Sequence, residues 1–296
     1  MAETKCSTLA SLNHPLLFEM IRSFTTMART LNLSQAVEEL KSTRQTVRRH
    51  IAQLEEARGN KLFKVVDRRY ELTPAGERAL PEANDILMRG QSWVNGEAGH
   101  LNGLFHMARA GEGHSFYIQQ HPIREVWNGP SGLLRRALQI WTEAEGQIAH
   151  SAFDEIRPYQ LTFRHGEGTW ICVEIGDKSS YASWYGREWS LSSVGRPLPS
   201  MPEGDTWTRL LTQPYEDVRA TGGVRYDHVQ TDAIRDPAKG PEAMSYVRLL
   251  LGCQFPDRSF SLVSIIERTH DIYIDGLSDE KRLAMSSDLK TNFDFE

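Results

Sequence analysis

The chain has 296 residues, which is enough for two ordinary domains and too long for one small module. Hydrophobic residues make up 40% of it and charged residues 25%, the composition of a soluble globular protein. Its formal net charge is −5, so the chain is not basic throughout. Cys6, Cys172 and Cys253 lie far apart and form no CxxC pair, which argues against a disulfide framework and a zinc site and fits a reducing cytosol.

Targeting and catalytic signals are also missing from the sequence. The N-terminus has no apolar run suited to a signal peptide, and the longest apolar stretch, around Leu249 to Cys253, is too short to span a bilayer. There is no GxSxG elbow, HExxH motif, Walker loop, or GxGxxG after a predicted strand. We therefore expect a cytoplasmic protein that is not an enzyme, makes no membrane contact and holds no cofactor or metal.

The first periodic segment follows a short stretch without pattern. Residues 1–13 show little periodicity and predict a flexible arm. Leu17, Ile21, Phe24 and Ala28 then recur at the spacing of one helical face. This pattern predicts a first helix that packs against the elements after it.

Two short helical patterns come next, with almost nothing between them. Leu33 and Leu40 lie on one face of the first, and Val47, Ile51 and Leu54 lie at i, i+4 and i+7 on the second. A tight pair of amphipathic helices of this kind predicts a helix-turn-helix.

Capping residues mark the ends of these two helices. Ser34 is suited to cap the first, Ser42 or Thr43 the second, and Ser42-x-x-Gln45 fits a capping box. Gly59 is the expected C-cap of the second helix.

The open face of the second helix carries arginine and amide side chains opposite its aliphatic face. Arginine and glutamine can bind base edges in a DNA major groove, and helix N-termini favour phosphate. A solvated basic face is the alternative interpretation. The candidate DNA-binding residues on the helix pair are Ser34, Gln35, Thr43, Arg44, Gln45, Thr46, Arg48 and Arg49.

Basic charge is concentrated in this part of the chain. The segment from Lys41 to Arg69 nets +6, and the rest of the chain nets −11. A local basic patch on an acidic protein is typical of a confined DNA contact. Residues 61–72 predict a short β-hairpin, or wing, whose Lys64, Arg68 and Arg69 we expect to contact phosphate or a minor groove.

A long helix is predicted over residues 74–105, with Thr73 as N-cap and Pro74 at the first position. A heptad-like apolar stripe runs along it and predicts dimerisation; packing on its own domain is the alternative. Gly90, Gly96, Gly99 and Gly103 weaken it, so an end near Gly96 is the alternative to the full range. The stripe consists of Leu80, Leu87, Val94 and Leu101.

Residues 14 to about 95 resemble the N-terminal winged helix-turn-helix of LysR-type transcription regulators. The matching pieces are FEMIRSFTTMARTLNLSQAVEEL, TVRRHIAQLEEARGNKLF and LTPAGERALPEA. The resemblance implies a domain at 14–73 that binds double-stranded DNA, and a linker helix that joins two copies of the chain. The sequence departs from the family where Thr43-Arg44-Gln45 replaces Ser-Gln-Pro and Arg48 replaces serine, which puts any borrowed operator sequence in doubt.

The second half of the chain has a different pattern. Residues 106–130 are rich in Gly, His and Pro and predict a hinge loop, in which His106, His114 and His121 are expected to be solvated. A helix is predicted from Ser131 to Gly146. Strand patterns follow at 159–164, 169–175, 224–229, 244–255 and 260–268, with helical pieces at 178–219 between the second and the third.

The order of these elements resembles that of PAS sensory domains: two strands, a helical crossing and three strands. We therefore expect an α+β chain of two domains: a winged helix-turn-helix with its linker helix, then a PAS-like domain at 131–275 with a five-stranded antiparallel sheet. Residues 276–296 are expected to form a tail. The short turns after residues 164 and 255 leave no room for a parallel crossover.

The function of this half is left open between several alternatives. The first alternative is a sensor of a small-molecule ligand, and the second is a ligand-free module that binds a partner protein. The third is a usual LysR effector domain with two parallel-stranded lobes, and the most distant is an enzyme. A PAS-like fold encloses a small pocket, although aromatic residues at such positions are more often plain core. The expected lining is Trp141, Tyr159, Trp170, Trp184, Tyr185 and Trp189.

Overall fold

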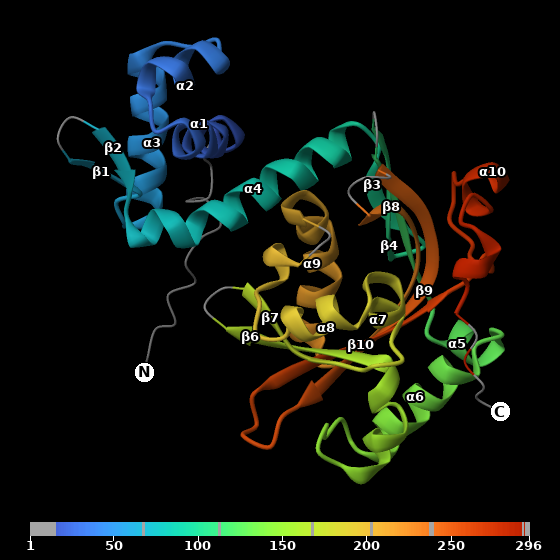
Figure 1. Ribbon diagram of the computed structural model, residues 1–296. Helices are drawn as coiled ribbons and strands as arrows, with labels where there is room; N and C mark the ends of the chain where they lie inside the picture. The colour runs from blue at the N-terminus through green and yellow to red at the C-terminus, as the bar shows by residue number, and fades with distance from the viewer. Residues whose placement is uncertain are drawn as a thin grey trace, which may run out of the picture. The chain divides into compact units, whose positions relative to one another are not determined.

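The computed structural model describes residues 16–66, 69–111, 114–166, 169–201, 204–236, 240–291 and 293, which are drawn as ribbons in Figure 1. The chain divides into two compact units, residues 1–91 and 92–296. The expected arm at 1–13 and the expected DNA contact Arg68 lie outside the described residues.

The N-terminal unit contains the predicted helices and hairpin. Apolar side chains from all of them form one core, in which Phe24, Met27, Ala36, Val47 and Leu62 are at most 1% exposed. The elements are α1 Leu17–Thr30, α2 Leu33–Glu39, α3 Arg44–Arg58, β1 Phe63–Val66 and β2 Arg69–Leu72.

The ends of α2 and α3 follow from local hydrogen bonds. The Asn32 side chain, and not that of Ser34 as expected, caps α2 by accepting from the backbone N–H groups of residues 34 and 35. Thr43 caps α3 by accepting from the Thr46 N–H at 3.1 Å. Gly59 ends α3 with φ +68°, a conformation that glycine adopts without strain.

Helix α4, Pro74–Val94, is shorter than predicted. The range to residue 105 is too long, and the alternative of an end near Gly96 agrees with the structure, in which Gly96, at φ +72°, ends the helix. The Gly96 N–H donates to the carbonyl of Trp93, and the Glu97 N–H donates to that of Ser92, the two bonds of a Schellman motif. Leu101 consequently lies in a strand rather than in the helical stripe.

The second unit is built on one eight-stranded sheet in the order β3-β4-β5-β8-β9-β10-β6-β7, and every pairing between its strands is antiparallel. This excludes the two parallel-stranded lobes of a usual LysR effector domain for the described strands. The strands are β3 Ala98–Leu101, β4 Leu104–Gly111, β5 His114–His121, β6 Gln160–Gly166, β7 Thr169–Ile175, β8 Val224–Asp236, β9 Gly240–Gln254 and β10 Phe260–Arg268.

The expected five-stranded sheet is wrong in its number of strands. The five predicted segments are strands and lie side by side as β8-β9-β10-β6-β7. The predicted hinge at residues 106–130 instead contains most of β4 and β5, which extend the sheet beyond β8. Their glycine and histidine content indicated a loop, whereas β5 pairs with β8, more than 100 residues away, and β4 pairs with β5.

Helices cover both faces of this sheet (Figure 1). On one face, Val247, Leu249 and Leu251 of β9 pack with α6; on the other, Leu250 packs with Tyr215 of α9. The helices are α5 Arg124–Asn128, α6 Gly132–Glu143, α7 Ser180–Tyr185, α8 Arg187–Ser193, α9 Gly204–Thr221 and α10 Asp279–Arg282, and the 3-10 turns are η2 Ser151–Glu155, η3 Arg157–Tyr159, η4 Leu198–Ser200 and η5 Ser287–Leu289.

Histidines on three neighbouring strands bind the segment after β10. His106 donates to the Asp275 carbonyl at 3.0 Å, and His121 donates to the Tyr273 carbonyl at 2.9 Å. The Tyr273 N–H donates to Nδ1 of His228 at 2.8 Å. His106 and His121 are therefore structural side chains, and their expected role as solvated loop residues is wrong.

Candidate nucleic-acid interface

Helix α3 has one buried face and one exposed polar face. Val47, His50 and Leu54 are at most 7% exposed and pack on the core of the N-terminal unit. The expected DNA-binding residues Arg44, Gln45, Arg48 and Arg49 are all exposed, and Thr46 is half-buried. The i, i+4, i+7 spacing of the apolar residues had predicted this division.

The buried face also contains a polar pair that the sequence pattern did not reveal. Oγ of Ser23 on α1 and Nδ1 of His50 on α3 lie 2.9 Å apart and are buried. A buried hydrogen bond of this kind has a defined geometry, so it fixes the rotation of α3 against α1. That rotation decides which side chains α3 presents to a ligand.

Side chains at the start of α2 and α3 link the two helices. Arg44 donates from Nη2 to Oγ of Ser34 at 2.8 Å. Gln35 and Thr43 are exposed at the two helix starts. The structure therefore brings the predicted polar residues of α2 and α3 to one side of the helix pair.

Of the two expected wing cations that the structure describes, one is already paired. Lys64 on β1 forms a 3.0 Å ion pair with Glu71, its cross-strand partner on β2. Arg69 is exposed at the start of β2. Because Lys64 is already paired, Arg69 is the more available of the two for an anion.

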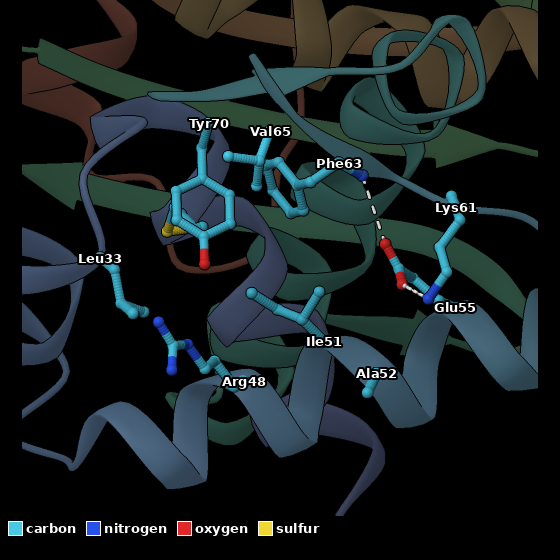
Figure 2. Close-up of a pocket in the computed structure, with 10 residues that line it drawn as sticks. Leu33, Arg48, Ile51, Ala52, Glu55, Lys61, Phe63, Val65 and Tyr70 are labelled. Atoms are coloured by element: carbon cyan, nitrogen blue, oxygen red, sulfur yellow. Dashed lines mark hydrogen bonds and ion pairs between the residues drawn. The ribbon is translucent and has the colours of Figure 1, made fainter. Parts of the chain in front are cut away.

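A buried carboxylate attaches the wing to α3. Glu55, whose side chain is 8% exposed, accepts from the N–H groups of Leu62 and Phe63 at 2.9 and 3.3 Å, and pairs with Lys61 at 2.6 Å. Two of these contacts appear in Figure 2. They fix the position of the first wing strand along α3.

A groove of about 230 Å³ lies between α3 and the wing. Figure 2 shows the guanidinium of Arg48 directed toward Leu33 at one end of the groove and Lys61 at the other. Apolar side chains form most of its walls, among them Leu33, Ile51, Phe63 and Val65. Arg48 has no hydrogen-bond or ion-pair partner among the described residues.

The predicted dimerisation stripe is exposed only in part. Leu80 and Leu87 are partly buried against the core of the N-terminal unit. By contrast, Ile86, Trp93 and Val94 are 48%, 71% and 74% exposed. Val94 of the predicted stripe is thus exposed, whereas Leu80 and Leu87 pack on the domain itself, and Ile86 and Trp93 add to the exposed apolar surface of α4. Leu101, in β3, is 37% exposed.

The aromatic residues of the predicted pocket are divided between two sides of the sheet. Trp141 and Tyr159 pack with the α6 side. Trp170 and Tyr185 belong to the cluster on the α9 side, and Trp170 donates to Glu216 at 2.8 Å. Trp184 is buried near the Arg268 guanidinium, and Trp189 is 46% exposed. The structure does not gather these six side chains around one space.

A buried ionic network, absent from the sequence analysis, lies under α9. Asp227 on β8 bonds Arg225 at 2.7 Å and Arg248 at 2.8 Å, and all three side chains are at most 3% exposed. Burial opposes ionisation of Asp227, yet the two arginines hold its pKa below the usual value. Tyr215 of α9 lies beside Arg248, so the network joins the sheet to the helical layer.

Other reactive groups have structural surroundings. Burial raises the pKa of Cys172 and of Cys253 to about 12, so both thiols stay protonated. Within the part of the chain that the structure describes, no three His, Cys, Asp or Glu side chains are placed to hold a metal ion. None of the helices in the same part is both long and apolar enough to span a bilayer.

Part of the chain is similar to parts of several solved structures. The oxidized form of Corynebacterium glutamicum OxyR is 26% identical over 27% of this chain, with a TM-score of 0.26, and the match spans only 26% of the OxyR chain. The CbnR_DBD–DNA complex is 29% identical, over 27% of this chain and 92% of that one, with a TM-score of 0.25. A transcriptional regulator of the LysR family from Eggerthella lenta DSM 2243 is 36% identical, over 24% and 94%, with a TM-score of 0.21.

The chain matches a protein family over part of its length, but it matches no curated protein. The family described as "Bacterial regulatory helix-turn-helix protein, lysR family" matches residues 18–77, which run from α1 into the first turn of α4. Residues 18–77 are therefore a bacterial regulatory helix-turn-helix domain of the lysR family.

Proposed function

We propose that the protein is a sequence-specific DNA-binding transcription regulator that acts on double-stranded DNA. The observation that carries this proposal is the exposed face of α3, on which Arg44, Gln45, Arg48 and Arg49 lie opposite a buried apolar face. Arginine and glutamine on an exposed helix match the hydrogen-bonding edges of bases in the major groove. The family match of residues 18–77 supports the same function.

Dimerisation through α4 is the second part of the proposal. Ile86 and Trp93 lie seven residues apart, two helical turns, and both are exposed. Burial of these side chains against a second copy removes apolar surface from water. A homodimer presents two α3 helices to DNA, and their separation must match about one helical turn or a multiple of it.

The second unit is proposed to be a PAS-like module that controls this spacing through α4. The order of two strands, a helical crossing and three strands supports a PAS-like core within the larger sheet. Beneath the crossing, Tyr215 and Val218 pack against Leu250 and Leu262, and these two leucines are 0% exposed.

Binding-site selection from a random duplex pool tests the DNA-binding proposal. The wild-type protein is expected to enrich a common sequence, and Arg49→Ala to lose about 1–3 kcal/mol of discrimination at one base position. Arg58→Ala, which removes an exposed arginine beyond the predicted contact face, is the matched control. The proposal is wrong if the wild-type protein enriches no sequence.

A further inference from the structure

The groove between α3 and the wing is suited, by its position and its chemistry, to bind one strand of a DNA duplex. In a duplex, the strand that separates the major from the minor groove passes between a helix in one groove and a hairpin that reaches the next. The groove of about 230 Å³ lies between these two elements here, with α3 as one wall and β1 and β2 as the other (Figure 2).

The two ends of the groove are cationic. Arg48 lies at the α2 end, is exposed, and has no ionic partner among the residues that the structure describes. Lys61 lies at the other end; its side chain is 75% exposed although its ammonium also contacts Glu55 at 2.6 Å. A free guanidinium donates two parallel hydrogen bonds to a phosphate, which a paired ammonium does less well.

The walls between these cations are apolar. Ile51 and Ala52 from α3 face the hairpin, and Val65 from the hairpin is 62% exposed at the groove. Apolar walls with a guanidinium at one end that is unpaired within the described part of the chain, away from the Glu55 carboxylate at the other end, suit an occupant that is partly apolar and negatively charged at its margin. A deoxyribose with its flanking phosphate has these properties.

We infer that the groove binds the sugar–phosphate backbone of the strand between the major and minor grooves, and that Arg48 is a phosphate contact rather than a base-reading residue. This inference rests on the proposed DNA-binding function. It assigns different roles to two adjacent arginines: Arg48 positions the protein on any duplex, whereas Arg49 is left to read bases.

The first test measures binding to a random-sequence duplex of about 30 base pairs, three helical turns, as a function of salt. Arg48→Met is expected to lower the affinity about tenfold and to lower the salt slope by about 1, the loss of one phosphate contact. Arg48→Lys retains the charge and is expected to restore most of the slope. Arg58→Met removes an equal charge about three helical turns from Arg48, at the C-terminal end of α3, and is expected to leave the slope unchanged.

The second test blocks the groove itself. Val65→Asp places a carboxylate on the groove wall, whereas Val66→Asp adds the same charge on the other face of the strand, outside the groove lining. We expect the first variant to weaken binding more than the second at every salt concentration. Melting curves of each variant establish that the domain remains folded.

Distinct results separate this inference from the function on which it rests. If Arg48→Met changes the enriched base sequence and leaves the salt slope intact, Arg48 reads bases and the inference is wrong, while the proposed function stands. Equal effects of Val65→Asp and Val66→Asp also overturn it. If the wild-type protein shows no salt-dependent binding to duplex DNA, the proposed function itself fails.

Discussion

Asp227 on β8 and Arg248 on β9 form a 2.8 Å ion pair in which the two side chains are 0% and 1% exposed. They are cross-strand partners in the register of β8 and β9, and Arg225, two residues earlier on β8, bonds the same carboxylate. Removal of one member of a buried ion pair leaves an uncompensated charge, which costs much more than loss of a surface pair.

Asp227→Ala is therefore expected to lower the free energy of unfolding of the second unit by about 3–5 kcal/mol, because the buried Arg248 guanidinium loses its ion-pair partner and Arg225 keeps only Asp217. Urea unfolding followed by tryptophan fluorescence measures this change. Glu155→Ala, which removes the surface partner of Arg136 from a 2.5 Å pair, is the control and is expected to cost about 0.5 kcal/mol or less. Similar losses in the two variants would contradict a structural role for the buried network.

Charge substitutions on α4 distinguish its outward from its inward face. Ile86→Asp and Trp93→Asp are expected to shift the protein toward monomer in sedimentation while the N-terminal unit stays folded, because both side chains are exposed. Leu87→Asp is expected instead to destabilise that unit, because Leu87 packs against its core. A double Ile86→Asp, Trp93→Asp variant that remains a dimer would place the interface elsewhere.

Acid sensitivity is expected from His228. Burial, together with the stacked His121 ring at 3.9 Å, lowers the pKa of His228 to about 3. Its pKa in the unfolded chain is about 6.5, so the unfolded state binds the additional proton as the pH falls between these values. Stability is therefore full above about pH 6.5 and decreases below it, by about 2 kcal/mol at pH 5.

The measurement is urea unfolding at pH 7.5 and pH 5 for the wild-type protein and for His228→Gln. The variant lacks the titrating ring. Its loss of unfolding free energy between pH 7.5 and pH 5 is therefore expected to be about 2 kcal/mol smaller than that of the wild-type protein. Both carry the same carboxylates, which cancel in the comparison. An unchanged pH dependence would show that His228 does not titrate as its surroundings require.

Glu55→Ala is expected to loosen the wing. The substitution leaves the N–H groups of Leu62 and Phe63 without their acceptor, at a cost of about 1–3 kcal/mol. Hydrogen exchange at these two amides should accelerate, with Glu56→Ala, its exposed neighbour, as the control. Unaltered exchange at residues 62 and 63 would exclude the carboxylate as the wing anchor.

Local pattern was sufficient for most of the N-terminal unit. The spacing of Val47, Ile51 and Leu54 predicted the inward face of α3, and Gly59 predicted its end. These features depend on residues within a few positions of one another, so the chain specifies them before any distant contact forms. Even here, Asn32 rather than Ser34 is the cap, since the exact helix start depends on one backbone conformation.

Tertiary contacts decided what lies further apart in the chain. The outward face of α4 depended on whether Leu87 packs on its own domain, which its heptad spacing does not determine. The groove beside Arg48 exists because Glu55 holds the first wing strand against α3.

In the second unit, too, some features follow from local sequence pattern and others only from tertiary contacts. Alternation and short turns identified β6, β7, β9 and β10 because the partners of these hairpins are close in sequence. By itself the sequence determined that these segments are antiparallel strands. Only the tertiary structure decided that β5 joins β8 and that His121 and His228 stack there, since a strand whose partner lies more than 100 residues away gains its hydrogen bonds only when the whole sheet has formed.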